Sequence, residues 1–148
     1  MIKEFMIGDL SKRTGCKVQT IRYYEEIGVM PIAARAHNNR RLYNDIHVSR
    51  LMFIRHSRSL GFTLDDIRDL LKLTDQPDHT CAEVDQIARN HLRNIQKKIG
   101  ALTTMEKEMK RMISQCQGEK ISECRIIDAL ANHAFDDTDN RLLTNSAY

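Results

Sequence analysis

A long hydrophobic stripe in the second half of the chain restricts the fold more than any other feature. Between Cys81 and about Ser114 an apolar residue recurs at every third or fourth position, a mean step close to the coiled-coil period of about 3.5 residues. A helix of this length extends roughly 50 Å, which is longer than a domain of this size can cover. The stripe consists of Ala88, Leu92, Ile95, Ile99, Leu102, Met105, Met109 and Ile113.

A narrow stripe on so long a helix predicts pairing with the same helix of a second chain. The alternative is a helical hairpin inside one chain. Nothing after Ser114 is long enough to form the second arm of such a hairpin. We therefore expect a homodimer.

The cysteines and the absence of long apolar segments indicate where in the cell the protein is found. The sequence has no run of about 18 apolar residues and no charged start leading into an apolar block, so it predicts neither a membrane span nor a secretory signal. We expect a soluble, cytoplasmic protein. In a reducing cytosol, four cysteines at positions 16, 81, 116 and 124 favour metal or redox chemistry over disulfides.

The N-terminal part predicts a helix-turn-helix followed by a wing. Two short segments, 6–14 and 18–28, carry apolar residues at helical spacing, and each ends at a glycine. Pro31 prevents further helix, and the segment up to Tyr43, rich in Ala, Arg and Asn, indicates a loop or a small hairpin. Two short helices around a tight turn are a helix-turn-helix candidate.

Two more helices complete this domain. A capped helix is expected from Asp45 to Gly61, and Thr63 with Asp66 resembles a capping pair for a helix that continues until Pro77. The apolar face expected for the first of these helices is Val48, Leu51, Met52, Phe53 and Ile54.

Basic residues are concentrated in the same region. Residues 1–60 carry 11 Lys and Arg against 5 Asp and Glu, whereas the remainder carries 12 against 15. A basic first part suits a polyanion such as DNA. The alternative is an ordinary solvated surface, and the charge excess alone does not separate the two.

Three runs carry a family resemblance: IGDLSKRTG, TIRYYEEIGVMP and RRLYNDIHVSRLMFIRHSRSLGFTLDDIRDLL. Together they resemble the MerR family of winged-helix regulators over residues 6 to about 74, and the long helix and cysteine loop extend the resemblance to about residue 131. It implies a dimer whose recognition helices enter successive major grooves of double-stranded promoter DNA. It also implies that the metal-bound form distorts the promoter so that RNA polymerase can engage.

The resemblance and the groove geometry together select the DNA-binding residues. Neighbours on a helix point about 100° apart, so Tyr23 rather than Tyr24 is expected to face DNA. Tyr43 has an alternative role, which is to brace the wing. The expected set is Lys12, Thr20, Arg22, Tyr23, Arg35, Arg41 and Tyr43.

The wing departs from the family pattern at two positions. Arg40 stands where an aromatic residue is common, and it is expected either to contact a phosphate or to be simply exposed. Asn38 stands where Gly is common, and Asn tolerates the left-handed conformation better than most residues. Asn39 matches a common turn residue.

Three cysteines form a candidate metal site. Cys116 and Cys124 flank the segment QGEKISE, which fits a loop that brings two thiolates together. The copper-type sensors of the family resemble this spacing but carry a non-thiol residue where this chain has Cys81, and a third sulfur argues for a divalent ion. In the antiparallel dimer that the resemblance implies, Cys81 of one chain completes the site of the other. All-sulfur ligation favours Cd(II) or Pb(II), then Hg(II), with Zn(II) last.

Other readings stay open for the thiols. Cys16 is expected to be a small buried residue, although some lead-type regulators carry cysteine at the matching place. His79 is either a fourth ligand or an exposed loop residue. The main alternative function is a regulator that responds to thiol oxidation or to an organic ligand, although a two-cysteine redox switch does not need Cys81. An enzyme of thiol chemistry is not expected, because the sequence shows no Cys-x-x-Cys and no nucleophile paired with a base.

The expected fold is therefore mainly α-helical. It comprises a winged helix-turn-helix DNA-binding domain at 1–76, a linker and antiparallel coiled-coil dimerisation helix at 77–116, a metal-binding loop with a short helix at 117–134, and a flexible tail at 135–148.

Overall fold

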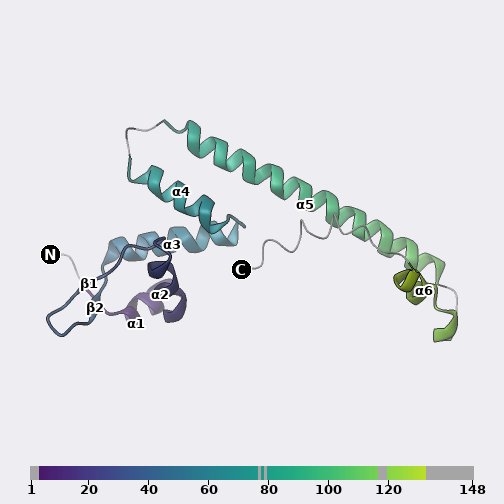
Figure 1. The fold of residues 1–148 in the computed structure, drawn as a ribbon, viewed down its shortest axis with the longest axis horizontal. Helices are drawn as coiled ribbons and strands as arrows, with labels where there is room; N and C mark the ends of the chain where they lie inside the picture. The colour runs from purple at the N-terminus through teal and green to yellow at the C-terminus, as the bar shows by residue number, and fades with distance from the viewer. Residues whose placement is uncertain (1–3, 77, 79, 117–119, 133–148) are drawn as a thin grey trace. The chain divides into compact units, whose positions relative to one another are not determined.

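The computed structural model describes residues 4–76, 78, 80–116 and 120–132. The chain divides into two compact units, residues 1–84 and 85–148 (Figure 1). His79 and the expected tail at 135–148 lie outside the described residues.

Four helices build the first unit: α1 (Ile7–Thr14), α2 (Val18–Glu26), α3 (Asp45–Ser59) and α4 (Leu64–Thr74). Helix α1 packs against α2 and α3, and α3 packs against α4. The helix-turn-helix expected from the sequence is thus present, and the mainly α-helical fold class is confirmed.

A small hairpin lies between α2 and α3, as expected for a wing (Figure 1). Its strands, β1 (Ala34–Arg35) and β2 (Arg41–Leu42), pair antiparallel. Just beyond β2, an antiparallel bridge joins Phe5 to Tyr43 through two backbone hydrogen bonds of 2.9 Å. The wing is therefore tied to the segment that precedes α1.

The core of this unit collects the inward faces of all four helices. One expectation was wrong: Met52, placed in the apolar face of α3, is 47% exposed. Leu51 and Ile54 point inward, and Met52 lies about 100° further round the helix, toward solvent. The fully buried apolar side chains are Leu10, Ile21, Val29, Met30, Tyr43, Leu51, Ile54 and Ile67.

Side-chain caps fix where α3 and α4 begin. The Asn44 side chain accepts hydrogen bonds from the backbone at the start of α3, and His47 completes a capping box. Thr63 and Asp66 form the capping box that the sequence predicts for α4.

The second unit consists of most of a long helix and the segment that returns after it. Helix α5 (Ala82–Gln115) matches the helix expected from the hydrophobic stripe. The short 3-10 turn η1 (Ile121–Glu123) and helix α6 (Arg125–Asn132) follow. Within the described residues, no helix is long and apolar enough to cross a membrane.

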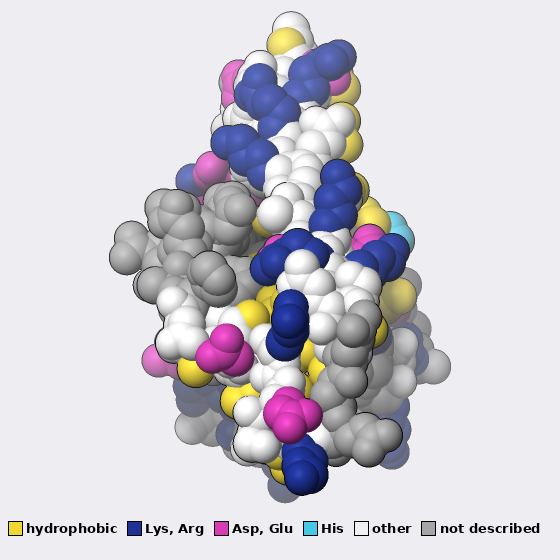
Figure 2. Space-filling model, turned by 90° about the vertical axis from the view of Figure 1, so that its right-hand side faces the viewer, with side chains coloured by type: hydrophobic (Ala, Val, Ile, Leu, Met, Phe, Trp, Pro, Cys, Tyr) yellow, Lys and Arg dark blue, Asp and Glu magenta, His cyan; other side chains and the backbone are white. Residues whose placement is uncertain are grey.

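The stripe on α5 faces solvent within one chain. In Figure 2, Lys and Arg side chains are numerous on the face shown, and hydrophobic side chains lie beside them. Large apolar side chains with so much exposure on one helix indicate a surface that a partner covers. They are Leu92, Ile95, Ile99, Leu102, Met109 and Ile113, each 36–59% exposed.

Gly15 makes the tight turn between α1 and α2, and it offers a direct test of the fold. Its φ is +66°, its N–H donates to the Ser11 carbonyl at 2.8 Å, and a Cβ there would lie 2.9 Å from Arg55 Nη1. Because a side chain in the left-handed region costs roughly 1–2 kcal/mol and Arg55 must also move, Gly15→Ala should lower the free energy of unfolding by about 1–3 kcal/mol.

Gly8→Ala is the matched control, because a Cβ at Gly8 meets nothing within 4 Å and the residue lies within α1. It should leave stability unchanged or raise it by up to about 1 kcal/mol. Urea unfolding at one fixed protein concentration, followed by circular dichroism, measures both variants. A Gly15→Ala variant as stable as Gly8→Ala would contradict this account of the turn.

Candidate metal centre and nucleic-acid interface

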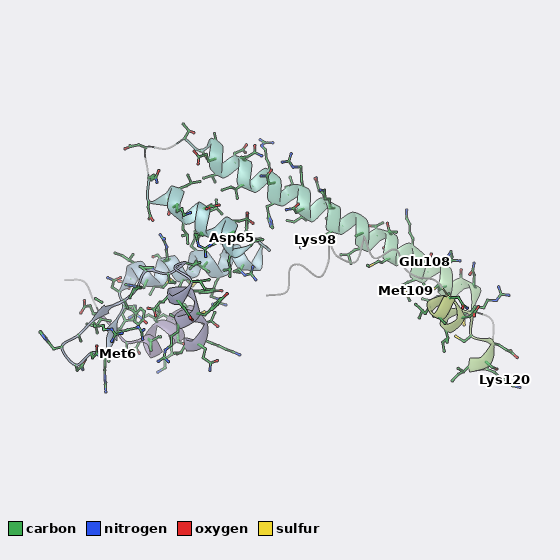
Figure 3. All side chains as sticks on the ribbon, in the orientation of Figure 1. Met6, Asp65, Lys98, Glu108, Met109 and Lys120 are labelled. Carbon is green, nitrogen blue, oxygen red and sulfur yellow. The ribbon has the colours of Figure 1, made fainter. Side chains whose placement is uncertain are left out.

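Two of the three candidate metal ligands lie together at the end of α5. Cys116 follows the last residue of α5, and Cys124 immediately precedes α6. The Cys116 thiol donates a hydrogen bond to the Cys124 sulfur, and both side chains are partly buried. These two sulfurs therefore lie within hydrogen-bond reach of each other. Lys120, labelled in Figure 3, lies at the start of the described returning segment.

The start of α6 favours the ionised form of Cys124. The pKa of Cys124 is lowered, first by a hydrogen bond from the backbone N–H of Ile127, with further hydrogen bonds from the Ile126 N–H and the Cys116 thiol, while burial opposes the shift. The exposed N–H groups and the dipole at a helix start stabilise a negative charge. The thiolate is the form of cysteine that binds a metal ion, so these residues fit a thiophilic ion.

Cys81 lies elsewhere in the chain. It is exposed, belongs to the first unit and directly precedes α5, so the 34 residues of that helix separate it from Cys116. Among the described residues, no three His, Cys, Asp or Glu side chains of one chain are grouped to hold a metal ion. One chain thus assembles two sulfurs of the candidate site and presents the third at the opposite end of α5.

Cys16 is placed differently from the other three cysteines. It is 7% exposed within the core, and burial raises the pKa of its thiol. Its backbone N–H donates to Thr14 Oγ1 at 3.3 Å. The interpretation of Cys16 as a small buried residue is consistent with this position.

The helix-turn-helix presents several of the expected DNA-binding side chains to solvent. Lys12 of α1 and Arg22 of α2 are exposed, and Thr20 is partly exposed. Tyr23 is 48% exposed whereas Tyr24 is 9% exposed, so of the two tyrosines Tyr23 is the one available to a partner.

The tip of the wing is a turn ordered by its own side chains. Asn39 takes the left-handed conformation with φ of 62°, so the residue that needs this conformation is Asn39 and not Asn38. Asn38 Oδ1 instead accepts a hydrogen bond from the Arg40 N–H at 3.2 Å. The exposed Arg35 donates to Asn39 Oδ1 at 2.7 Å, which ties the first strand to the turn.

Tyr43 lies inside the protein. Its side chain is fully buried, and its hydroxyl donates to Glu25 Oε1 at 3.0 Å. Burial first, and then this bond to a carboxylate, raises the pKa of Tyr43 well above its usual range. The geometry matches the bracing role, and Tyr43 offers DNA no surface to contact.

Glu25 is the functional candidate that the sequence analysis missed. It is 7% exposed, and its Oε2 lies 3.6 Å from Arg41 Nε of the wing. The sequence did carry a signal, because Glu25 follows Ile21 at helical spacing and so occupies the buried face of α2.

A cavity of about 270 Å³ opens between the start of α1, helix α2 and the wing. Its wall includes three arginines and no acidic residue. Met6, labelled in Figure 3, belongs to it from the α1 side. The lining is Met6, Ile7, Arg22, Asn39, Arg40, Arg41 and Tyr43.

Comparisons with known proteins agree with this architecture. A model described as "MerR HTH family regulatory protein" matches residues 5–74, and one described as "MerR, DNA binding" matches residues 48–112. Heavy metal-dependent transcription regulator 1 of Rhizobium meliloti is 37% identical over 129 residues, covering 86% of this chain and 88% of the relative. The HTH-type transcriptional regulator ZntR of Escherichia coli is 37% identical over 133 residues, covering 88% and 94%.

Two solved structures resemble the chain. The transcription regulator PbrR691 of Ralstonia metallidurans, in complex with lead(II), matches with a TM-score of 0.78 and 39% identity, covering 85% of this chain and 98% of the other. The dual-function regulator MerR of Bacillus megaterium, in complex with mercury(II), matches with a TM-score of 0.68 and 31% identity, covering 86% and 100%. The chain belongs to the MerR family of helix-turn-helix regulatory proteins.

Proposed function

We propose that the chain is a homodimeric transcriptional regulator that binds promoter DNA and responds to a thiophilic divalent metal ion. The observation that carries the metal response is the pair of sulfurs at the start of α6, where Cys116 donates to Cys124 and backbone N–H groups favour the Cys124 thiolate. Relatives named for heavy-metal dependence and similar structures with lead(II) and mercury(II) support the proposal.

The proposed metal ligands are Cys81, Cys116 and Cys124. A bound ion would supply the positive charge that holds the thiolates together. Three sulfurs favour soft ions, so the preferred order is Cd(II) or Pb(II), then Hg(II), then Zn(II). His79 is not needed for this set.

Dimerisation through α5 supplies the third sulfur in this proposal. Six large apolar side chains on α5 are exposed within one chain, and an antiparallel partner would cover them. In such a pair the end of one helix lies beside the start of the other. Cys81 of one chain then completes the site that Cys116 and Cys124 of the other begin.

The helix-turn-helix and the wing are the proposed DNA-binding surface, with successive major grooves as the target. We leave out Tyr43 because it is buried. The metal-bound dimer would distort the promoter, and RNA polymerase would respond to that change in the DNA. The proposed contacts are Lys12, Thr20, Arg22, Tyr23, Arg35 and Arg41.

Arg22 offers the first test of DNA binding. Because it is exposed on α2 and positively charged, Arg22→Ala should weaken binding about tenfold. The slope of log affinity against log salt concentration reports the number of phosphate contacts. If Arg22 contacts a phosphate, the variant should make this slope less steep by about one. Fluorescence anisotropy, with a duplex that the wild-type protein selects from a random pool, gives both values.

Arg93→Ala is the control for that experiment, because Arg93 is an exposed arginine of α5 outside the proposed surface. Its affinity and salt dependence should equal those of the wild type. Equal affinities for Arg22→Ala and Arg93→Ala would refute the assignment of α2 as the DNA-reading helix.

Cys81→Ser tests the metal centre. The reduced wild-type protein should show a sulfur-to-metal ultraviolet band that saturates near one Cd(II), Pb(II) or Hg(II) per chain. Cys81→Ser should weaken the band and the affinity, because it removes one of three sulfurs. Titration of each ion, and of Zn(II), into both proteins measures this and orders the metals.

Cys16→Ala is the matched control, since it removes a thiol that is buried in the core. Its titration should match that of the wild type. If the wild-type protein shows no saturable band with any ion, the proposed metal response is contradicted. The alternative, a regulator that responds to thiol oxidation or to an organic ligand, would then be favoured.

A further inference from the structure

The cavity between α1, α2 and the wing has a composition suited to an anion. Three arginines line it, Arg22 of α2 and Arg40 and Arg41 of the wing, and no acidic residue does. Arg22 and Arg40 are exposed, and the Arg41 side chain is 40% exposed. Guanidinium groups that converge on one open space match the oxygens of a phosphate.

The start of α1 adds to this wall. Met6 and Ile7 line the cavity, and Met6 is the N-cap residue of an eight-residue helix that has no side-chain cap. Backbone N–H groups at an uncapped helix start favour a negative charge nearby. The cavity therefore combines an N-terminal helix end with three arginines.

A buried carboxylate lies directly behind these positive groups. The Glu25 side chain is 6% exposed and receives the Tyr43 hydroxyl on Oε1 and the Arg41 guanidinium near Oε2. Arg41 Nε is itself buried and has no hydrogen-bond partner in the described part of the chain. The ion pair with Glu25 is thus the contact that holds the inner side of Arg41, a residue that also lines the cavity.

The same cluster joins two elements that both belong to the proposed DNA surface. Glu25 comes from α2, whereas Arg41 and Tyr43 come from the second strand of the wing and the residue beyond it. Arg22 stands one helical turn before Glu25, and its charge, like that of Arg41, acts to lower the pKa of the Tyr43 hydroxyl. Both arginines are therefore close to the group that Glu25 binds.

We propose that Glu25 is a positioning residue for DNA binding: it holds Arg41 of the wing beside Arg22 of α2, so that both guanidiniums contact one backbone phosphate in the cavity. This inference rests on the proposed DNA-binding function and deepens it. A carboxylate on a DNA-binding surface repels phosphate and is costly to bury. Its position is explained by the orientation that it gives to Arg41.

A role of Glu25 through its charge alone and a role in positioning Arg41 predict opposite effects of Glu25→Gln on DNA affinity. Loss of a negative charge near DNA should tighten binding if Glu25 acts only through its field. If Glu25 positions Arg41, the variant should bind the wild-type-selected duplex about tenfold more weakly. The salt dependence should also become less steep by about one, the value for one phosphate contact. Fluorescence anisotropy over a series of salt concentrations measures affinity and steepness together.

Glu26→Gln is the matched control, because it removes the same charge from the next residue, which is exposed. It should bind as the wild type does or slightly more tightly, with unchanged salt dependence. In an Arg41→Ala background, Glu25→Gln should change the salt dependence no further, because the contact that it positions is already gone. Circular dichroism confirms that each variant is folded.

The outcomes separate this inference from the proposed function. A wild-type protein that selects no duplex would contradict the proposed function itself. A wild-type protein that binds DNA, with Glu25→Gln indistinguishable from Glu26→Gln, would overturn only the role of Glu25. An additional fall in salt dependence in the Arg41→Ala background would show that Glu25 does not act through Arg41. If Glu25→Gln does not fold, Glu25→Asp, which keeps the charge but shortens the side chain by one methylene, carries the same expected fall.

Discussion

The proposed dimer and the proposed metal site both depend on the apolar stripe of α5. Side chains such as Ile99 and Leu102 are more than half exposed on a helix of 34 residues, and apolar surface of this extent is stabilised when a second helix removes it from water. An antiparallel partner places opposite helix ends together. In the proposed antiparallel dimer, the stripe therefore determines whether Cys81 of one chain can meet Cys116 and Cys124 of the other, and a packing requirement becomes a requirement of the proposed metal site.

The two proposed functional regions use charge in opposite ways. At the metal centre, helix N–H groups stabilise a negative sulfur at Cys124, which prepares a site for a cation. Between α2 and the wing, a buried carboxylate at Glu25 holds a cation, which prepares a surface for an anion. In both places a helix or a buried group orients the charged atom before a ligand binds. This orientation reduces the loss of side-chain conformational entropy on binding.

Local patterns in the sequence were sufficient for most of the fold. The helical spacing of apolar residues, the glycine at Gly15 and the capping pair Thr63 and Asp66 are short-range signals, and each predicted its element. Met52 was misplaced because the apolar face of α3 is narrower than its run of apolar residues, whereas the role of Tyr43 depends on a contact with a distant residue. The Tyr43 hydroxyl donates to Glu25, 18 residues earlier in the chain, and no local spacing in the wing reveals that partner. Cys116 and Cys124 were predictable as a pair because a short loop joins them, whereas only the family resemblance suggested the place of Cys81.

The most direct test of the account is a mixed dimer in which one chain carries Cys81→Ser and the other carries Cys116→Ser with Cys124→Ser, isolated through two different affinity tags. If each metal site is shared between chains, one of the two sites keeps all three sulfurs, and the dimer should bind one Cd(II) or Pb(II) ion with the ultraviolet band of the wild type at half its intensity. Neither variant homodimer should show that band at the wild-type affinity. If all three ligands come from one chain, the mixed dimer contains no intact site. A mixed dimer whose ultraviolet band is no more intense than the average of the two variant homodimers would contradict the shared site.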